Sequence, residues 1–213
     1  ENNIPNWTNT SICRRGGCFT FTTNDLINIT PSNETSFTSN SNFTVALWFN
    51  GTDPSTGFGD TERMITLIDA NGTINIWTVY YIPDTFIGST DNVTAFFING
   101  NGSGSTTLYS TPNQGVLPRL LHFVVARFEA LNSTPENTTA NMSIWVNGRI
   151  SASTITTSNL SVPSGQPKLN IGPDYTGMLD EVLIFNRSLS DQEILYLNGS
   201  DGVWETIVAQ ETT

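Results

Sequence analysis

The 213-residue sequence contains few positive charges. Eight Lys and Arg residues stand against 19 Asp and Glu, which gives a formal net charge of −11. So few cations can neither neutralise the phosphates of a nucleic acid nor hold the chain on an anionic membrane surface. We therefore expect no nucleic-acid partner and no binding to anionic lipid.

Long apolar runs and metal-binding side chains are scarce as well. No apolar segment approaches the roughly 20 residues of a membrane-spanning helix, so we expect no membrane insertion in this segment. His122 is the only histidine, and Cys13 and Cys18 are the only cysteines. A zinc site would need two further ligands, so the cysteines predict a small disulfide loop in an extracellular chain. The sequence starts at Glu1 without a signal peptide, which we interpret as a processed product or an excised piece.

The residue patterns of common catalytic sites are also missing. Glu-x-Asp-x-Glu, which places paired carboxylates on one strand face of polysaccharide-cleaving enzymes, does not occur. Asp180 and Glu181 are adjacent, so they should point to opposite faces of a strand. A Ser-His-Asp triad needs an exposed histidine, whereas His122 lies in the apolar segment 121–126. We therefore predict that the protein is not an enzyme.

Asparagine, serine and threonine are abundant. The chain has 24 Asn, and Ser and Thr together number 51, so chance predicts roughly 6 Asn-x-Ser/Thr sequons. The excess over chance predicts N-linked glycans and a secreted or cell-surface glycoprotein. We expect most sequon asparagines on turns or outward strand positions, and Asn42 and Asn141, which each enter a strand, are the least expected to be modified. The 15 sequons begin at Asn6, Asn9, Asn28, Asn33, Asn42, Asn50, Asn71, Asn92, Asn101, Asn132, Asn137, Asn141, Asn159, Asn186 and Asn198.

Short apolar segments separated by Gly, Pro, Asn or Asp clusters are typical of an all-β protein. The length favours one domain, residues 1–202, followed by a tail, residues 203–213. Asn99-Gly100 and Asn147-Gly148 predict hairpin turns, because both residues tolerate positive φ. Strands are predicted near residues 18–21, 26–29, 43–49, 64–69, 74–81, 93–98, 106–109, 121–129, 142–146, 149–155, 168–171 and 179–185.

The segment 177–199 predicts a buried strand, a tight turn and a short capped helix. Apolar residues occupy both alternating positions of 182–185, as in the middle of a packed sandwich. The helix signals are a capping box formed by Ser190 and Glu193, a hydrophobic staple formed by Leu189 and Ile194, and a stop at Gly199.

This ending resembles that of the laminin-G-like jelly rolls of the concanavalin A-like lectin/glucanase superfamily. Those modules finish with a glycine, Leu/Ile-Asp-Glu-Val, an apolar strand, Asn-Arg and a Leu-Ser-x-x-Glu-Ile helix. The matching residues here are Gly177, 179–182, Asn186-Arg187 and 189–194, and segments 16–21, 42–49, 122–126 and 142–148 follow the family's order. The resemblance covers roughly residues 13–198. It implies an all-β, antiparallel jelly-roll β-sandwich (concanavalin A-like) with one short C-terminal helix.

The resemblance also implies a candidate metal ligand. Related folds often place an Asp at the position of Asp180, where it joins main-chain oxygens near the N-terminus around a structural calcium ion. The alternative is that Asp180 caps a loop by accepting hydrogen bonds from N–H groups.

Three tryptophans in predicted strands, Trp48, Trp77 and Trp145, are candidate ligand-binding residues. If Ile144 faces the core, Trp145 lies on an exposed sheet surface, where sugar rings stack in lectin-like relatives. Packing is the alternative for these rings, since aromatic residues are ordinary sheet formers.

Modules of this family usually begin with one more strand beside residues 179–185, and residues 1–11 do not match it. The strand-like tail segment 202–209 is either a linker or fills that vacant edge, in its own domain or a neighbour's. We predict a non-catalytic extracellular recognition or adhesion module that binds glycan or a surface protein. The alternative is a structural subunit of a glycosylated extracellular filament or surface layer that assembles by strand exchange.

Overall fold

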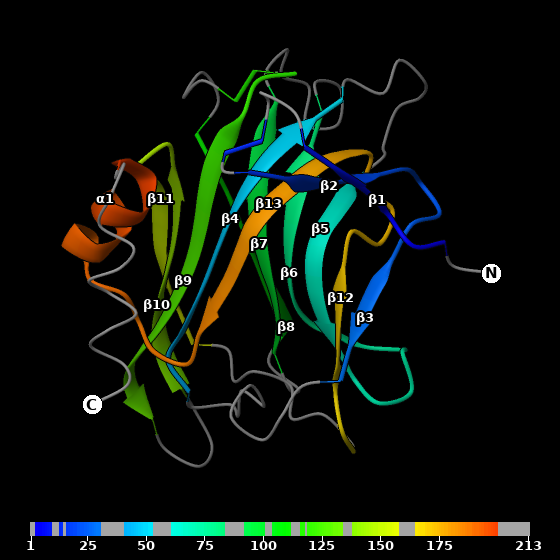
Figure 1. The fold of residues 1–213 in the computed structure, drawn as a ribbon. Helices are drawn as coiled ribbons and strands as arrows, with labels where there is room; N and C mark the ends of the chain where they lie inside the picture. Colours follow the sequence, from blue (N-terminus) through cyan, green and yellow to red (C-terminus); the bar gives the residue numbers. More distant parts are fainter. Residues whose placement is uncertain are drawn as a thin grey trace, which may run out of the picture.

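The computed structural model describes residues 3–9, 13–14, 16–30, 41–52, 61–83, 92–100, 104–111, 116–117, 119–133, 138–157 and 165–199. Within these residues, strands form two antiparallel sheets, and one short helix follows the last strand (Figure 1). The predicted all-β sandwich with a short C-terminal helix is thereby confirmed. The tail, residues 203–213, lies outside the described residues, and its role stays a prediction.

The two sheets have seven and six strands. The first has the order β1-β2-β13-β4-β9-β10-β11. Its strands are β1 (Asn6–Thr8), β2 (Cys18–Phe21), β13 (Gly177–Phe185), β4 (Phe43–Gly51), β9 (His122–Ser133), β10 (Thr138–Val146) and β11 (Arg149–Thr156). The second has the order β3-β12-β5-β6-β7-β8. Its strands are β3 (Ile27–Ile29), β12 (Lys168–Ile171), β5 (Glu62–Ile68), β6 (Asn75–Ile82), β7 (Val93–Gly100) and β8 (Gly104–Tyr109). Every strand predicted from the sequence is present.

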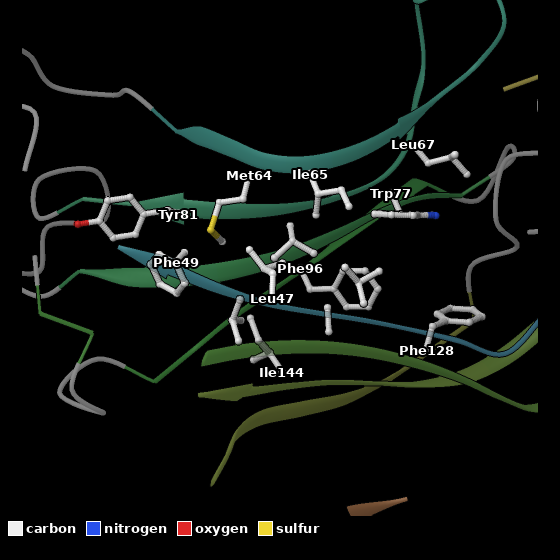
Figure 2. Packing of buried hydrophobic residues seen from close by; sticks show 14 of the residues in the cluster. Leu47, Phe49, Met64, Ile65, Leu67, Trp77, Tyr81, Phe96, Phe128 and Ile144 are labelled. Carbon is white, nitrogen blue, oxygen red and sulfur yellow. The ribbon is translucent and has the colours of Figure 1, made fainter. Parts of the chain in front are cut away.

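The main core lies between the two sheets, where apolar side chains of both interdigitate (Figure 2). Phe43 stacks on Trp77 with ring centroids 5.5 Å apart and on Phe128 at 5.4 Å. Figure 2 shows Phe49 and Tyr81 near one end of this layer and Phe128 near the other. Burying each such side chain contributes about 1.5–3 kcal/mol, so the sandwich interior supplies most of the driving force for folding.

A second core lies on the outer face of the seven-stranded sheet, under the helix α1 (Asp191–Gly199). Ala46 and Trp48 of β4 pack there with Ile194 and Leu197 of α1. Since the alternate residues of β4 fill the main core, this strand is buried on both faces. A strand buried on both faces requires apolar residues at consecutive positions, and this explains why β4 does not alternate between apolar and polar residues.

The helix begins as its sequence predicts. The Glu193 N–H donates to Ser190 Oγ at 3.3 Å, and the Ser190 N–H donates to Glu193 Oε2 at 2.7 Å. Leu189 and Ile194 are both buried in the second core. The capping box and the hydrophobic staple are thereby confirmed.

One of the two predicted hairpin turns is confirmed. Asn147 and Gly148 have φ of 50° and 76° and join β10 to β11, as a tight turn between twisted strands requires. Gly100 instead pairs with Gly104 at the end of β7. The prediction of a turn at Asn99-Gly100 is therefore wrong, because these residues still belong to the strand.

Strand β1 was missed by the sequence analysis. Its residues Asn6–Thr8 pair with β2, and β2 pairs with Gly177–Leu179 of β13. The vacant edge expected beside residues 179–185 is therefore shorter than predicted, because β2 occupies its start. A strand of three residues leaves too little alternation to be recognised in a sequence.

Candidate functional site

The three tryptophans predicted to bind ligand are buried. Trp77 is 0% exposed and lies between the sheets, as Figure 2 shows. Trp145 and Trp48 are 5% and 8% exposed and lie in the second core. The prediction that these rings are available to sugars is therefore wrong, and the packing alternative describes them.

Trp145 shows why the prediction failed. Ile144 does face the main core, so Trp145 does point to the opposite face of the sheet. That face is covered by Ile194 and Leu197 of α1, and the Trp145 indole Nε1 donates to Ser143 Oγ at 3.3 Å. The error lay in treating the outer face of the sheet as solvent-exposed when an apolar helix face was available to cover it.

Arg127 fixes the helix onto this face. Its Nη1 donates to the Leu189 carbonyl oxygen at 2.8 Å and to Asp191 Oδ1 at 2.7 Å. The guanidinium also lies 5.5 Å from the centre of the Trp145 ring, in a cation–π contact. Because Arg127 is itself buried, these contacts satisfy a charge that would otherwise be costly to bury. We conclude that this outer face is structural.

Asp180 acts as a hydrogen-bond acceptor beside the disulfide loop. Cys13 and Cys18 form the predicted disulfide. Within this loop the Arg14 N–H donates to Asp180 Oδ2 at 2.7 Å, and the Glu181 N–H donates to Asp180 Oδ1 at 2.9 Å. Across the described ranges, His, Cys, Asp and Glu form no group of three or more that could hold a metal ion. The two contacts at Asp180 are those of the loop-capping alternative. Calcium at Asp180 stays a prediction.

His122 is buried, and both of its ring nitrogens have partners. Its Nε2 lies 2.9 Å from the Leu117 carbonyl oxygen, and its Nδ1 lies 3.0 Å from the Asn147 side-chain nitrogen. Asn147 Oδ1 in turn accepts the Phe123 N–H at 3.0 Å. The imidazole therefore ties the β10–β11 turn to the start of β9.

A polar pocket lies on the outer face of the six-stranded sheet, over β12 and β5 and beside the turn that precedes β3. Asn28, Asn170 and Thr66 are cross-strand neighbours there. Ile171, the next residue of β12, packs into the main core, so the row that contains Asn170 faces outward. The pocket has a volume of about 340 Å³, and its lining includes Arg63, Ile68, Asn75, Asn170 and Asp174.

Donors and acceptors converge in the polar pocket. Arg63 forms a salt bridge with Asp174, and its Nε donates to Asp174 Oδ2 at 2.9 Å. Both side chains keep exposed surface, 32% and 55%. Asn170 Oδ1 accepts the Asn28 Nδ2–H at 2.9 Å. The pocket can therefore offer a guanidinium, a carboxylate and amides to a ligand with hydroxyl groups.

Sequence reasoning missed this pocket because its residues are far apart in the chain. Arg63 is one of only eight cations, which is the one signal that could have drawn attention to it. Asp174 lies in the left-handed region, with φ of 62°, in the turn after β12. Only the strand register brings that turn beside β5.

A second depression, the edge groove, lies where β1, β2 and β13 face β3 and β12. It has a volume of about 330 Å³. Trp7, 63% exposed, meets the ring of Phe19 edge-on with centroids 5.0 Å apart. Its apolar lining includes Trp7, Phe19, Phe21, Ile27, Ile171 and Val182.

The sequon asparagines differ in exposure. Asn92 is 9% exposed, and its Oδ1 accepts the Tyr81 O–H at 3.1 Å, so this side chain points inward. Asn42, Asn50, Asn141 and Asn198 are half-buried. Asn33, Asn101, Asn137 and Asn159 lie outside the described residues. The exposed sequon asparagines are Asn6, Asn9, Asn28, Asn71, Asn132 and Asn186.

Comparison with known proteins places the fold. Residues 21–195 match the family model of the concanavalin A-like lectin/glucanases superfamily. None of the curated proteins matches the chain. In the part of the chain that the structure describes, no helix has the length and apolar character to span a bilayer.

Several solved structures are similar. The binding domain of botulinum neurotoxin serotype G is 14% identical with a TM-score of 0.60, covering 92% of this chain and 45% of that one, so the chain spans less than half of that domain. Domain 4 of an extracellular arabinanase from Geobacillus stearothermophilus, in complex with arabinotriose, is 13% identical with a TM-score of 0.58, covering 93% and 83%. A heptameric pentraxin from Limulus polyphemus is 10% identical with a TM-score of 0.54, covering 84% and 82%. At these identities the likeness concerns the fold alone.

Proposed function

Because the chain belongs to the concanavalin A-like lectin/glucanases superfamily, we infer that it is a non-catalytic recognition module whose polar pocket binds a neutral saccharide. The observation that carries this proposal is the pocket itself. Its volume of about 340 Å³ lies in the range of small-ligand sites, and its lining is mostly polar. Sugar hydroxyls both donate and accept, which matches a pocket lined by one guanidinium, two carboxylates and three amides.

The charge of the chain favours a neutral ligand. Its formal net charge of −11 repels anionic sugars before they reach the surface. Arg63 is paired with Asp174, so the pocket presents no unbalanced cation to a sulfate or carboxylate. Adjacent hydroxyls of a neutral sugar can accept from Arg63 and donate to Asp174 at the same time.

The carboxylates around the pocket support a binding role rather than hydrolysis. Asp25 Oδ2 accepts the Thr22 N–H at 2.7 Å and the Thr22 O–H at 2.9 Å, which holds the turn before β3. Asp174 is paired with Arg63. Both carboxylates are therefore engaged by structural partners, which favours a role in shaping the pocket and binding a ligand.

The similar structures support the same class of function. One is the receptor-binding domain of a neurotoxin, and another is a domain solved with arabinotriose. Exposed sequons and a disulfide support an extracellular or cell-surface location with N-linked glycans. The partner in this proposal is an extracellular glycan.

A charge-matched pair of variants tests the proposal. Glycan-array screening identifies a neutral saccharide, and calorimetry then compares Arg63→Met with Arg149→Met, which removes an exposed arginine of β11 away from the pocket. Loss of hydrogen bonds to a charged donor should weaken binding by about 10–100-fold in Arg63→Met and leave Arg149→Met at the wild-type affinity. Equal affinity in both variants, or binding of anionic glycans alone, would refute the assignment.

A further inference from the structure

The two halves of β13 have different neighbours. Gly177–Leu179 pair with β2 on one side and with β4 on the other. A β-bulge follows between Asp180 and Leu183, where Glu181 takes a φ of 45°. Beyond the bulge, β4 still pairs with one side of β13 (Figure 1). No strand among the described residues pairs with the opposite side of β13 there. The segment Val182–Phe185 is therefore an open half-edge.

The side chains of the open half-edge are those of a central strand. Val182 and Ile184 pack against the main core, and Leu183 and Phe185 pack against the second core. All four remain only half-buried. Apolar residues on both faces of a strand are typical of a position with neighbours on both sides. Here one of those neighbours is missing from the described part of the chain.

The edge groove continues this open half-edge. Val182 lines the groove together with Leu179 of β13, Ile27 of β3 and Ile171 of β12. Unpaired backbone N–H and C=O groups along a strand are a template for another strand. An added strand would pair with Val182–Phe185 and could place alternate side chains into the groove.

The sequence of the chain contains a suitable strand. Residues 203–209 read Val-Trp-Glu-Thr-Ile-Val-Ala, which is rich in β-branched and aromatic residues and has no Gly or Pro. This segment lies outside the described residues and begins four positions after Gly199, the last residue of α1.

Distance decides which copy of this segment can reach the open half-edge. Asn198 lies beside the β10–β11 turn. Its side chain fills the space that a Cβ atom at Gly148 would need. The strands lie in the order β13-β4-β9-β10, so β10 is three strand spacings from β13. A strand added on the open side of β13 would be four spacings, or about 19 Å, from β10. The four steps from Gly199 to Val203 span at most about 14 Å. Val203 therefore cannot lie at this edge in its own molecule, and pairing of the whole segment 203–209 with β13 requires a second copy.

We propose that residues 203–209 of a second copy of this chain add to β13 along Val182–Phe185. The tail of one molecule then occupies the edge of the next, so donor and acceptor surfaces differ. A contact of this kind does not close on itself in a pair and generates rings or open filaments. It is independent of saccharide binding in the polar pocket.

Sedimentation velocity on three forms of the protein tests this proposal. The full chain should form concentration-dependent oligomers, and removal of residues 203–213 should abolish them. Ile207→Pro should weaken them, because proline fixes φ and removes a backbone donor in the middle of the added strand. Thr212→Pro is the matched control and should keep the oligomers, since it lies beyond the added strand.

Each other outcome overturns the proposal. A full chain that stays monomeric at every concentration has no intermolecular strand. If the full chain is a monomer and removal of residues 203–213 lowers its thermal midpoint, the tail packs against its own domain. Oligomers that survive both truncation and Ile207→Pro use another surface. None of these results bears on saccharide binding, so the polar pocket is judged separately by its own variants.

Discussion

The two outer faces of this sandwich differ in what covers them. The face of the seven-stranded sheet is closed by α1, which buries Trp48 and Trp145 in a second core. The face of the six-stranded sheet keeps a polar pocket over β12 and β5, beside the turn that precedes β3. The tryptophans that the sequence offers for stacking on sugar are thus buried in packing. The proposed function therefore places recognition on the polar face.

The difference is set by a short stretch of sequence. Leu189, Ile194 and Leu197 give α1 an apolar side, and Arg127 satisfies the carbonyl and carboxylate at its beginning. No described helix follows a strand of the six-stranded sheet. An outer face therefore becomes a core or a candidate binding surface according to the segment that follows it in the chain.

The largest expected effect concerns the closed face. Trp145→Ala should lower the free energy of unfolding by about 3–5 kcal/mol, because it leaves a large cavity under α1. Trp7→Ala, which truncates a ring that is 63% exposed, should cost about 1 kcal/mol or less. Urea unfolding of the two variants measures the comparison, and similar costs would contradict the burial of Trp145.

The next effect concerns the polar face and the chain's own glycans. Asn28 donates to Asn170 of the pocket, and Asn71 precedes Gly72, which lines it. A glycan on either asparagine should compete with a free saccharide. In glycosylated protein, the double variant Asn28→Gln, Asn71→Gln should bind the free saccharide several-fold more tightly, whereas Asn132→Gln on β9 should not. Calorimetry on matched preparations decides, and unchanged affinity in the double variant would mean that these positions carry no competing sugar.

The smallest effect is a pH dependence of the closed face. Hydrogen bonds from Arg187, with help from Ser190, lower the pKa of Glu193 from 4.5 to about 2. A carboxyl with a depressed pKa stabilises the folded state above its unfolded pKa, and this contribution is lost as the pH falls from about 4.5 to 2. Because Glu193 and Arg187 are partly exposed, the loss should be only about 1 kcal/mol.

Glu193→Gln should flatten this part of the pH profile. Glu129→Gln on β9 is the comparison, since Glu129 forms no ion pair in the part of the chain that the structure describes. Thermal midpoints measured between pH 2 and 5 would show the difference. An identical acid limb in wild type and Glu193→Gln would mean that the capping box adds nothing to stability.

Local sequence patterns were sufficient to predict the fold, but they were not sufficient to predict the candidate site. Alternation and turn residues located the strands, and Ser190, Glu193, Leu189 and Ile194 located the helix, because each signal lies within a few residues. The exposure of Trp145 depended on where α1 docks, which is a contact between segments about fifty residues apart. The pairing of Arg63 with Asp174 likewise depends on the register of β12 with β5. Such contacts have no local signature.

The measurement that most directly separates the two faces is an NMR titration of isotope-labelled protein with a neutral saccharide identified on the array. The account predicts shifts in the backbone amides of Arg63, Asn170 and Asp174, with the indole N–H signals of Trp48 and Trp145 unchanged. Shifts at the Trp145 indole, with the amides of the polar pocket unmoved, would contradict it.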